Sequence, residues 1–367
     1  MNACPRDAIA ATLDEDGFLL PVVDEKRCVD CGLCERVCAA TQPPELAAPS
    51  AANLFVHNDR DVLRNSTSGG AFTALSDCAL AQNGAVVGAM MDEKLAIRHA
   101  VAESTGQRDR MRGSLYVQSD PNFVYRDVKA LLEKGRFVLF VGTPCQVYGL
   151  KRFLNRKYDN LILVDFLCHG VPSASLLRAH IAWLEKLYGR QAKSYSFRSK
   201  KFGWRPAAIE EIVFQDGSRE SALPVQAYNK FFHNNVSLRA SCLTCPFRRA
   251  ERCSDLTVGD FWGVAKICGE KLRRGASLVL VNSPEGESFL KRASQAGRLK
   301  NVPIEKILYR VAPPKPRVKG DRDAFWKLYR EQGYPALVAN YAKRSKKERI
   351  LYYWKRLVKI MIAKLLG

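Results

Sequence analysis

Residues 136–145, RFVLFVGTPC, decide the fold class, because an apolar run ends there in a turn that contains glycine and proline. Such a run is typical of a strand buried on both faces of a sheet. The turn precedes a helix that is predicted through Leu154. Residues 161–170, LILVDFLCHG, repeat the pattern, and the next helix is expected over residues 174–187. Two strand–turn–helix units in succession predict parallel βαβ connections and therefore an α/β fold.

Further strands are predicted over residues 84–91, 194–198, 210–221 and 276–282, and a further helix over residues 286–297. Some of these strands are antiparallel, so the predicted core is a mixed α/β body. In open α/β sheets, ligands bind beyond the carboxyl ends of the strands. Cys145 and Cys168 each follow such an end, which makes both candidates for a functional site.

The composition limits the class of protein. The chain has 367 residues, of which 47% are apolar, enough for two or three domains with a sizeable core. It has no uninterrupted apolar stretch of membrane-spanning length, and its first residues, MNACP, contain neither a charged leader nor an apolar signal core. We therefore expect a cytoplasmic protein. In that compartment the twelve cysteines are expected to be metal ligands or redox groups rather than disulfides.

The first cysteine group has the spacing of bacterial ferredoxins: Cys28, Cys31, Cys34 and Cys38 follow the pattern C-x2-C-x2-C-x3-C. Cys4 and the proline after it resemble the end of a preceding copy. By the crossed ligation of two-cluster ferredoxins, Cys4, Cys28, Cys31 and Cys34 hold one 4Fe–4S cluster, and Cys38 serves another whose remaining ligands are missing. Either the natural start is absent or one cluster has been lost. A structural zinc site is the alternative.

A second cysteine group, Cys242, Cys245 and Cys253, places three thiols within twelve residues. Cys168 is the best candidate for a fourth ligand because it ends a buried strand. A zinc site with four cysteines is again the alternative. Positive charge that would offset thiolates is supplied nearby by Arg248, Arg249 and Arg252.

Seven short motifs occur in order along the chain. They are NSTSGG (65–70), GSLYVQS (113–119), GTPCQ (142–146), CHGVPS (168–173), GWR (203–205), CxxCP (242–246) and DxxxGDFW (255–262). With the ferredoxin-type segment in front, the chain resembles the beta subunit family of coenzyme F420 hydrogenase and dehydrogenase over roughly residues 1–300. The resemblance implies FAD and a nearby 4Fe–4S cluster, whose matching ligands are Cys168, Cys242, Cys245 and Cys253.

The resemblance also places the flavin near the loop of Ser66, Thr67, Ser68, Gly69 and Gly70. This loop would suit a phosphate, because it offers hydroxyl groups, glycines that let the backbone approach closely, and the N-terminus of the helix that follows. The alternative is that the motif only caps that helix. Other residues that would contact flavin or simply pack are Ser114, Tyr116, Thr143, Pro144, Cys145 and Gln146. His169 is the candidate proton donor, beside Cys168, unless it is structural. Cys145 is a second candidate catalytic residue.

We expect three parts: a ferredoxin-type segment over residues 1–45, a core that binds FAD and a 4Fe–4S cluster over 53–310, and a basic tail over 311–367. The expected function is an iron–sulfur flavoprotein oxidoreductase that exchanges electrons with a redox partner protein or ferredoxin. Its small-molecule substrate would be a deazaflavin, an unsaturated ring or a precursor of cell-surface polysaccharide. The alternative is a non-catalytic electron-transfer subunit of a larger complex.

The net charge of +21 suits acidic partners, and residues 343–367 contain nine Lys or Arg and one Glu. Apolar residues recur every three or four positions from Ile350, which predicts an amphipathic helix over residues 345–367. Such a helix would lie on an anionic membrane, at its inner face, or dock on protein instead. Nucleic acid is not expected, because the basic excess is concentrated in this tail.

Overall fold

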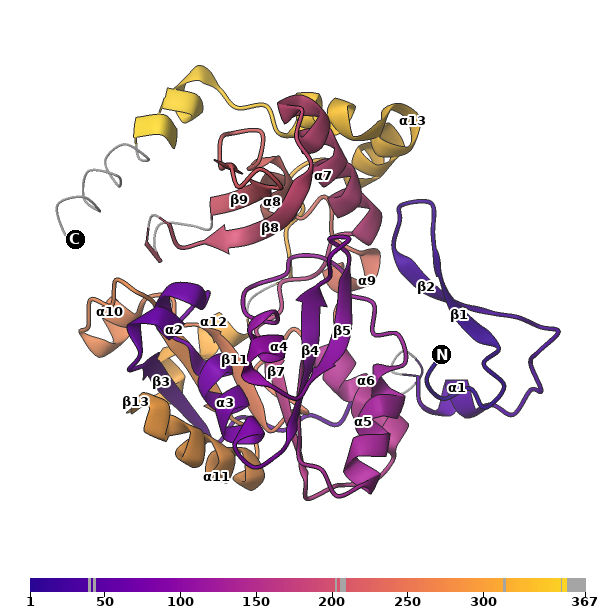
Figure 1. The fold of residues 1–367 in the computed structure, drawn as a ribbon, viewed down its shortest axis with the longest axis vertical. Coiled ribbons are helices and arrows are strands. Elements are labelled where there is room, and N and C mark those ends of the chain that lie inside the picture. Colours follow the sequence, from indigo (N-terminus) through magenta and orange to yellow (C-terminus); the bar gives the residue numbers. More distant parts are fainter. Residues whose placement is uncertain are drawn as a thin grey trace.

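The computed structural model describes residues 1–38, 41, 44–201, 203–204, 209–312, 315–350 and 352–354. These residues form two lobes and an N-terminal hairpin that lies against both (Figure 1). The lower lobe in that view contains a large mixed sheet covered by helices. The upper lobe contains a three-stranded sheet and longer helices.

The lower lobe is an eight-stranded sheet whose strand order is β13-β3-β12-β11-β7-β6-β4-β5. Strands β4, β6, β7 and β11 are parallel. Strand β12 is antiparallel to both β11 and β3, so β3 ends at the same edge as the parallel strands. The strands are β3 (Ala51–His57), β4 (Ala85–Met91), β5 (Ile97–Ala102), β6 (Val138–Gly142), β7 (Leu161–Phe166), β11 (Leu256–Asp260), β12 (Ser277–Val281) and β13 (Gly297–Val302).

Helices bury both faces of this sheet. Helices α3 (Ala71–Leu80) and α11 (Pro284–Ala293) cover one face, where Val86 and Leu139 are buried. Helices α5 (Val124–Glu133) and α6 (Pro144–Leu154) cover the other, where Val87 and Phe140 are buried. Successive strand residues thus alternate between two cores, as the pleat requires. The α/β class predicted from the apolar runs is confirmed.

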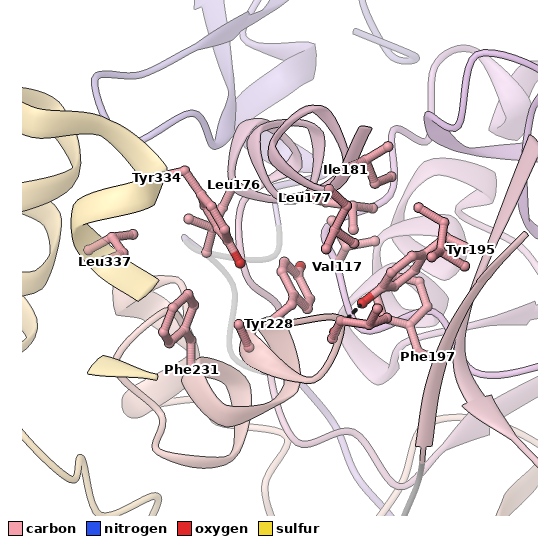
Figure 2. Packing of buried hydrophobic residues seen from close by; sticks show 14 of the residues in the cluster. Val117, Leu176, Leu177, Ile181, Tyr195, Phe197, Tyr228, Phe231, Tyr334 and Leu337 are labelled. Carbon is pink, nitrogen blue, oxygen red and sulfur yellow. Dashed lines mark hydrogen bonds between the residues drawn. The ribbon is translucent and has the colours of Figure 1, made fainter. Parts of the chain in front are cut away.

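The upper lobe is built round an aromatic core (Figure 2). His180 lies fully buried in it, with Nε2 3.1 Å from the Tyr195 hydroxyl and Nδ1 2.7 Å from the Tyr334 hydroxyl. The Tyr195 hydroxyl donates to the carboxyl of Glu210. The elements of this lobe are α7 (Ala174–Tyr188), β8 (Ala192–Ser199), β9 (Ile209–Phe214), β10 (Arg219–Glu220), α8 (Ala227–His233) and α13 (Arg322–Tyr341).

Helix α13 corrects the expected boundary at residue 311. The sequence predicted a basic tail from there, but α13 buries Phe325, Trp326, Tyr334 and Leu337 in the upper lobe. Gly333 has φ 75° and ψ −175° and interrupts the helix, which hides its periodicity from a sequence pattern. Of the amphipathic helix predicted over residues 345–367, residues 351 and 355–367 lie outside the described residues.

The N-terminal hairpin consists of β1 (Ile9–Leu13) and β2 (Leu19–Val23), followed by α1 (Leu33–Arg36). The side chain of Gln118 accepts from the Leu19 amide at 2.8 Å and donates to the Leu19 carbonyl at 2.9 Å. Arg126 pairs with Asp7 at 2.7 Å. The hairpin is therefore fastened to the body by specific polar contacts. The remaining short helices are α2 (Arg60–Asn65), α4 (Thr105–Asp109), α9 (Ala240–Leu243), α10 (Val264–Cys268) and α12 (Leu308–Val311).

Candidate functional site

A cavity of about 1100 Å³ lies at the carboxyl edge of the large sheet. Its wall includes residues that follow β3, β6 and β7, residues of the upper lobe such as Arg198 and Phe232, and residues of the N-terminal hairpin such as Leu20 and Pro21. Pockets for drug-sized ligands measure ~300–1,000 Å³. The cavity is therefore large enough for a ligand the size of a dinucleotide.

The Ser-Gly-Gly loop forms one end of this cavity. Ser66, Thr67, Ser68 and Gly70 line it, and α3 starts directly after them. Gly69 lies behind the wall: a Cβ there would sit 2.4 Å from backbone atoms of both β3 and β12, so only glycine lets the loop pack so closely. Gly70 has φ 85°, a conformation that glycine adopts without strain. The amides of Gly69 and Ala71 donate to the Ser277 hydroxyl at 2.9 and 3.5 Å, and the N-terminus of α3 borders the cavity, a position that suits an anion.

Lys200 holds this loop in place. Its ammonium donates to the carbonyls of Leu63 at 2.8 Å, Ser68 at 2.6 Å and Arg274 at 2.7 Å. Burial lowers the pKa of Lys200 to about 8. No sequence pattern indicates this residue, because its partners lie in residues 63–68 and at Arg274, both far from Lys200 along the chain.

Four cysteines, Cys145, Cys168, Cys242 and Cys245, line the cavity together. Cys145 lies in the first turn of α6, where Thr143 and Gln146 form a capping box, and Cys168 follows β7. Burial raises the pKa of Cys168, and raises that of Cys242 to about 11, with the neighbouring thiols adding to both shifts. Arg248 lies close enough to Cys168, Cys242 and Cys245 for its guanidinium to interact with their thiolate forms.

Cys253 is not part of this wall. It is 8% exposed and packs in the apolar core beneath α6, and burial raises its pKa to about 12. The spacing and the resemblance both placed Cys253 among the four cluster ligands, whereas the structure brings Cys145 to the other three cysteines. The reason is topological, since residues 253–255 already lead down into β11 while Cys145 stays at the carboxyl edge.

Among the described residues, no three His, Cys, Asp or Glu side chains are arranged around a single metal ion. A 4Fe–4S cube places different requirements on its ligands, because each cysteine binds a different iron. In the N-terminal segment, Cys28 and Cys31 are exposed, and Cys34 and Cys38 are half-buried. Cys4 accepts a hydrogen bond from the Ala8 amide at 3.2 Å, and such bonds lower the pKa of its thiol. Cys4 and Cys34 both lie near the Met1 amino group.

His169 lines the cavity beside Cys168. Its Nε2 lies 2.6 Å from Oδ1 of Asn235, whose Nδ2 donates to the Arg317 carbonyl at 2.8 Å. Since the amide nitrogen is used in that second bond, His169 must donate from Nε2, and its Nδ1 carries the lone pair. Burial lowers the pKa of His169, so the ring is neutral at pH 7.

Asp260 brings two of the sequence motifs together. It forms an ion pair with Arg198 and accepts from Nε1 of Trp204 at 3.0 Å. Trp204 stacks on Trp262 with ring centroids 5.0 Å apart. Tyr116, which lines the cavity, stacks on Phe232 at 4.5 Å. Ser114, Thr143, Pro144 and Gln146 also lie in the wall.

Residues 135–307 match a family model that describes the C terminus of the coenzyme F420 hydrogenase/dehydrogenase beta subunit. This segment belongs to the coenzyme F420 hydrogenase/dehydrogenase beta subunit family. It contains the four cavity cysteines, Arg198 and Asp260. The Ser-Gly-Gly loop, the N-terminal hairpin and α13 lie outside the matched residues.

A solved structure shares the fold: a chain of the F420-reducing NiFe hydrogenase complex from Methanosarcina barkeri, studied by xenon derivatization. The two chains are 17% identical with a TM-score of 0.51, and the match covers 78% of this chain and 94% of that one. No curated protein matches the chain. No helix within the described residues is both long and apolar enough to cross a membrane.

Proposed function

We propose that this chain is an iron–sulfur flavoprotein oxidoreductase that passes electrons between 4Fe–4S clusters and FAD to reduce or oxidise a small molecule. One observation carries the proposal: four cysteines and a Ser-Gly-Gly loop at a helix N-terminus border the same cavity. A cluster and a dinucleotide bound to these groups would be neighbours, as electron exchange between them requires.

The inner cluster would be held by Cys145, Cys168, Cys242 and Cys245. Burial raises the pKa of the first three thiols and keeps them protonated in the absence of metal, so binding iron must release protons from them. Arg248 would offset part of the resulting negative charge. The entry cluster would use Cys4, Cys28, Cys31 and Cys34, and the exposure of Cys28 and Cys31 favours electron transfer from a redox partner protein there.

The dimensions of the cavity fit a flavin dinucleotide. The Ser-Gly-Gly loop follows β3 and the Thr143–Gln146 turn follows β6, four strand positions away. At ~4.8 Å per strand that separation is about 19 Å, which an extended dinucleotide can cover and a mononucleotide cannot. The phosphates would lie against the first turn of α3, and Ser114 and Tyr116 would contact the ligand between the two ends.

Bound FAD would supply the conversion between two-electron and one-electron chemistry. This chain's own residues would position it and move protons. Nδ1 of His169 is free of the bond to Asn235, so it can accept or return a proton at the substrate. Cys145, a candidate catalytic residue on sequence grounds, is assigned instead to cluster ligation because it shares the wall with the three other cysteines.

The cavity volume of about 1100 Å³, which exceeds the ~300–1,000 Å³ of pockets for drug-sized ligands, favours an enzyme over a purely electron-transferring subunit. That subunit remains the alternative, and the matched chain from a hydrogenase complex is the observation in its favour. The substrate would be a deazaflavin, an unsaturated ring or a polysaccharide precursor. The test is anaerobic purification of the full chain, with iron, sulfide and flavin counted after reconstitution. Protein that retains no flavin and shows no absorption near 400 nm would refute the function.

We also propose attachment to an anionic membrane through the C-terminal segment. Ile350, Tyr353 and Trp354 are 61%, 43% and 60% exposed. They follow a run of five Lys or Arg within residues 343–349, and Tyr352 anchors the segment by donating to the Ser221 carbonyl at 2.7 Å. Aromatic side chains beside basic ones suit a lipid interface.

Flotation with vesicles tests this attachment. The full chain should bind vesicles that contain anionic lipid and lose binding when Tyr353 and Trp354 are both changed to serine. Equal recovery with neutral and anionic vesicles would contradict the proposal.

A further inference from the structure

Arg126 holds the loop that contains Cys4 against the start of α5. Its Nε donates to the Asn2 carbonyl at 2.8 Å, and its Nη2 donates to the Cys4 carbonyl at 2.6 Å. The same Nη2 pairs with the Asp7 carboxylate at 2.7 Å. One guanidinium therefore binds the loop at Cys4 itself and on both sides of it, and Cys4 is a proposed ligand of the entry cluster.

Asn2 completes this attachment by capping α5. That helix begins after Phe123, whose side chain makes no capping hydrogen bond. Oδ1 of Asn2 accepts from the amides of Tyr125 at 3.2 Å and Arg126 at 3.3 Å. Its Nδ2 donates to the Asn122 carbonyl at 2.8 Å. Because the first amides of a helix need partners from outside it, α5 and the N-terminal segment stabilise each other.

Tyr125 connects the start of α5 to the inner cysteines. Its hydroxyl donates to the carbonyl of Gln146, the residue that follows Cys145 in the first turn of α6. This bond is 2.9 Å long, and the hydroxyl lies close enough to Cys145 for their charged forms to interact. The Tyr125 ring packs on Phe140 and Phe153 with centroids 5.9 and 6.0 Å apart. The start of α5 is therefore fixed to the turn that carries Cys145.

Adjacent residues of α5 thus reach both groups of cysteines. Arg126 contacts the loop of Cys4, and Tyr125 contacts the turn of Cys145. Figure 1 shows the N-terminal segment and α1 beside α5 and α6. Electron transfer between two clusters slows steeply as the distance between them grows, so a connection of this kind would govern how fast they exchange electrons.

We propose that Arg126 is a positioning residue that holds the entry cluster close enough to the inner cluster for electrons to pass between them. The proposal rests on the proposed function, which supplies both clusters. In the step concerned, one electron leaves the reduced entry cluster, which is oxidised, and enters the oxidised inner cluster, which is reduced. No covalent bond forms or breaks, so the contribution of the protein is the spacing of the two clusters.

The test uses the full chain, reconstituted anaerobically and reduced with dithionite. Electron paramagnetic resonance detects the magnetic interaction between two reduced clusters, which splits or broadens their signals when the clusters are close. Wild type should show this interaction. Arg126→Leu should keep about eight irons per chain, four for each cluster, but lose the interaction. Arg126→Lys keeps a positive charge beside Asp7 and should recover part of it.

The matched control is Arg136→Leu. Arg136 also forms an ion pair, with Glu103 at 2.8 Å, and also donates to two carbonyls, those of Asn83 and Gly84. These partners lie in the lower lobe, away from the cysteines. Arg136→Leu should therefore lower the melting temperature about as much as Arg126→Leu and leave the magnetic interaction unchanged.

Two results in the variants would overturn the proposal. If Arg126→Leu keeps both clusters and their full interaction, or if Arg136→Leu loses the interaction as well, Arg126 does not position the entry cluster and only this inference fails. If Arg126→Leu takes up no entry cluster, Asn2→Ala decides instead, because it removes the cap of α5 and leaves Arg126 in place. Loss of the interaction in Asn2→Ala would support the proposal, and an unchanged interaction would overturn it.

Wild-type protein separates this inference from the proposed function. If it binds two clusters that do not interact, or one cluster alone, there is no close pair for Arg126 to hold, and this inference fails while the inner site stands. If it binds no iron, the proposed function fails and this inference with it.

Discussion

Cys145 and Cys253 offer a direct comparison, because one lies on the cavity wall and the other lies in the core beneath it. We expect Cys145→Ala to lose the inner cluster and Cys253→Ala to keep it. Alanine suits the first turn of α6, where Cys145 sits, so the helix and its capping box should survive that change. Each variant is therefore a control for the other.

The two variants should change different quantities, iron content for Cys145→Ala and unfolding free energy for Cys253→Ala. A 4Fe–4S cluster holds four irons, so Cys145→Ala should lower the iron content by about four per chain. Cys253→Ala should leave iron unchanged. It removes one buried sulfur from an apolar cluster, a loss of about 1 kcal/mol of unfolding free energy. For a chain of this size that corresponds to a fall of roughly 2 °C in melting temperature.

The assay is iron and sulfide analysis after anaerobic reconstitution, with absorption near 400 nm and thermal unfolding measured on the same samples. The reverse pattern, in which Cys253→Ala loses about four irons and Cys145→Ala loses none, would refute the assignment. It would mean that iron draws Cys253 out of the core and toward the other three cysteines.

Two further predictions concern buried charge. Burial raises the pKa of Glu210 to about 8, from a value near 4.5 in the unfolded chain, so unfolding releases its proton between these pH values. The free energy of unfolding should therefore fall as pH rises from about 5 to 8. Glu210→Gln should flatten this fall in thermal melts, and an unchanged slope would contradict the prediction. Lys200→Met should weaken FAD binding by about tenfold or more, because three carbonyls around the Ser-Gly-Gly loop lose their donor. The neighbouring half-exposed Lys201→Met is its control, and equal affinities in the two variants would disprove the role of Lys200.

The strongly apolar elements could be predicted from the sequence. β4 and β6 are continuous apolar runs, and β7 and β12 are apolar apart from one residue each, a pattern typical of buried strands. β5 (IRHAVA) and β13 (GRLKNV) were missed because edge strands mix polar and apolar residues, and β3 was missed because it follows directly after a segment rich in proline and alanine. Apolar periodicity identifies the middle of a sheet better than its margins.

The candidate site, like the fold, was predicted only in part from the sequence. Motif spacing and resemblance indicated Cys168, Cys242, Cys245 and the Ser-Gly-Gly loop, and the structure brings all of these to one cavity except Gly69, which lies just behind its wall. That Cys145 rather than Cys253 lines the cavity with the other three cysteines could not be predicted, because Cys253 is closer along the chain to Cys242 and Cys245. Lys200 was missed because only long-range packing gives it its surroundings.

The N-terminal segment with its hairpin forms part of the wall around the proposed flavin site, since Met1, Asn2, Leu19 and Leu20 line the cavity. A shortened protein that begins after residue 45 would therefore be open on one side. It could fold, keep every other contact residue and its inner cluster, and still lose its flavin during purification, because the ligand escapes through the open side. Absence of flavin from such a fragment would report a missing wall rather than a missing affinity, so flavin content has to be measured on protein that keeps residues 1–45.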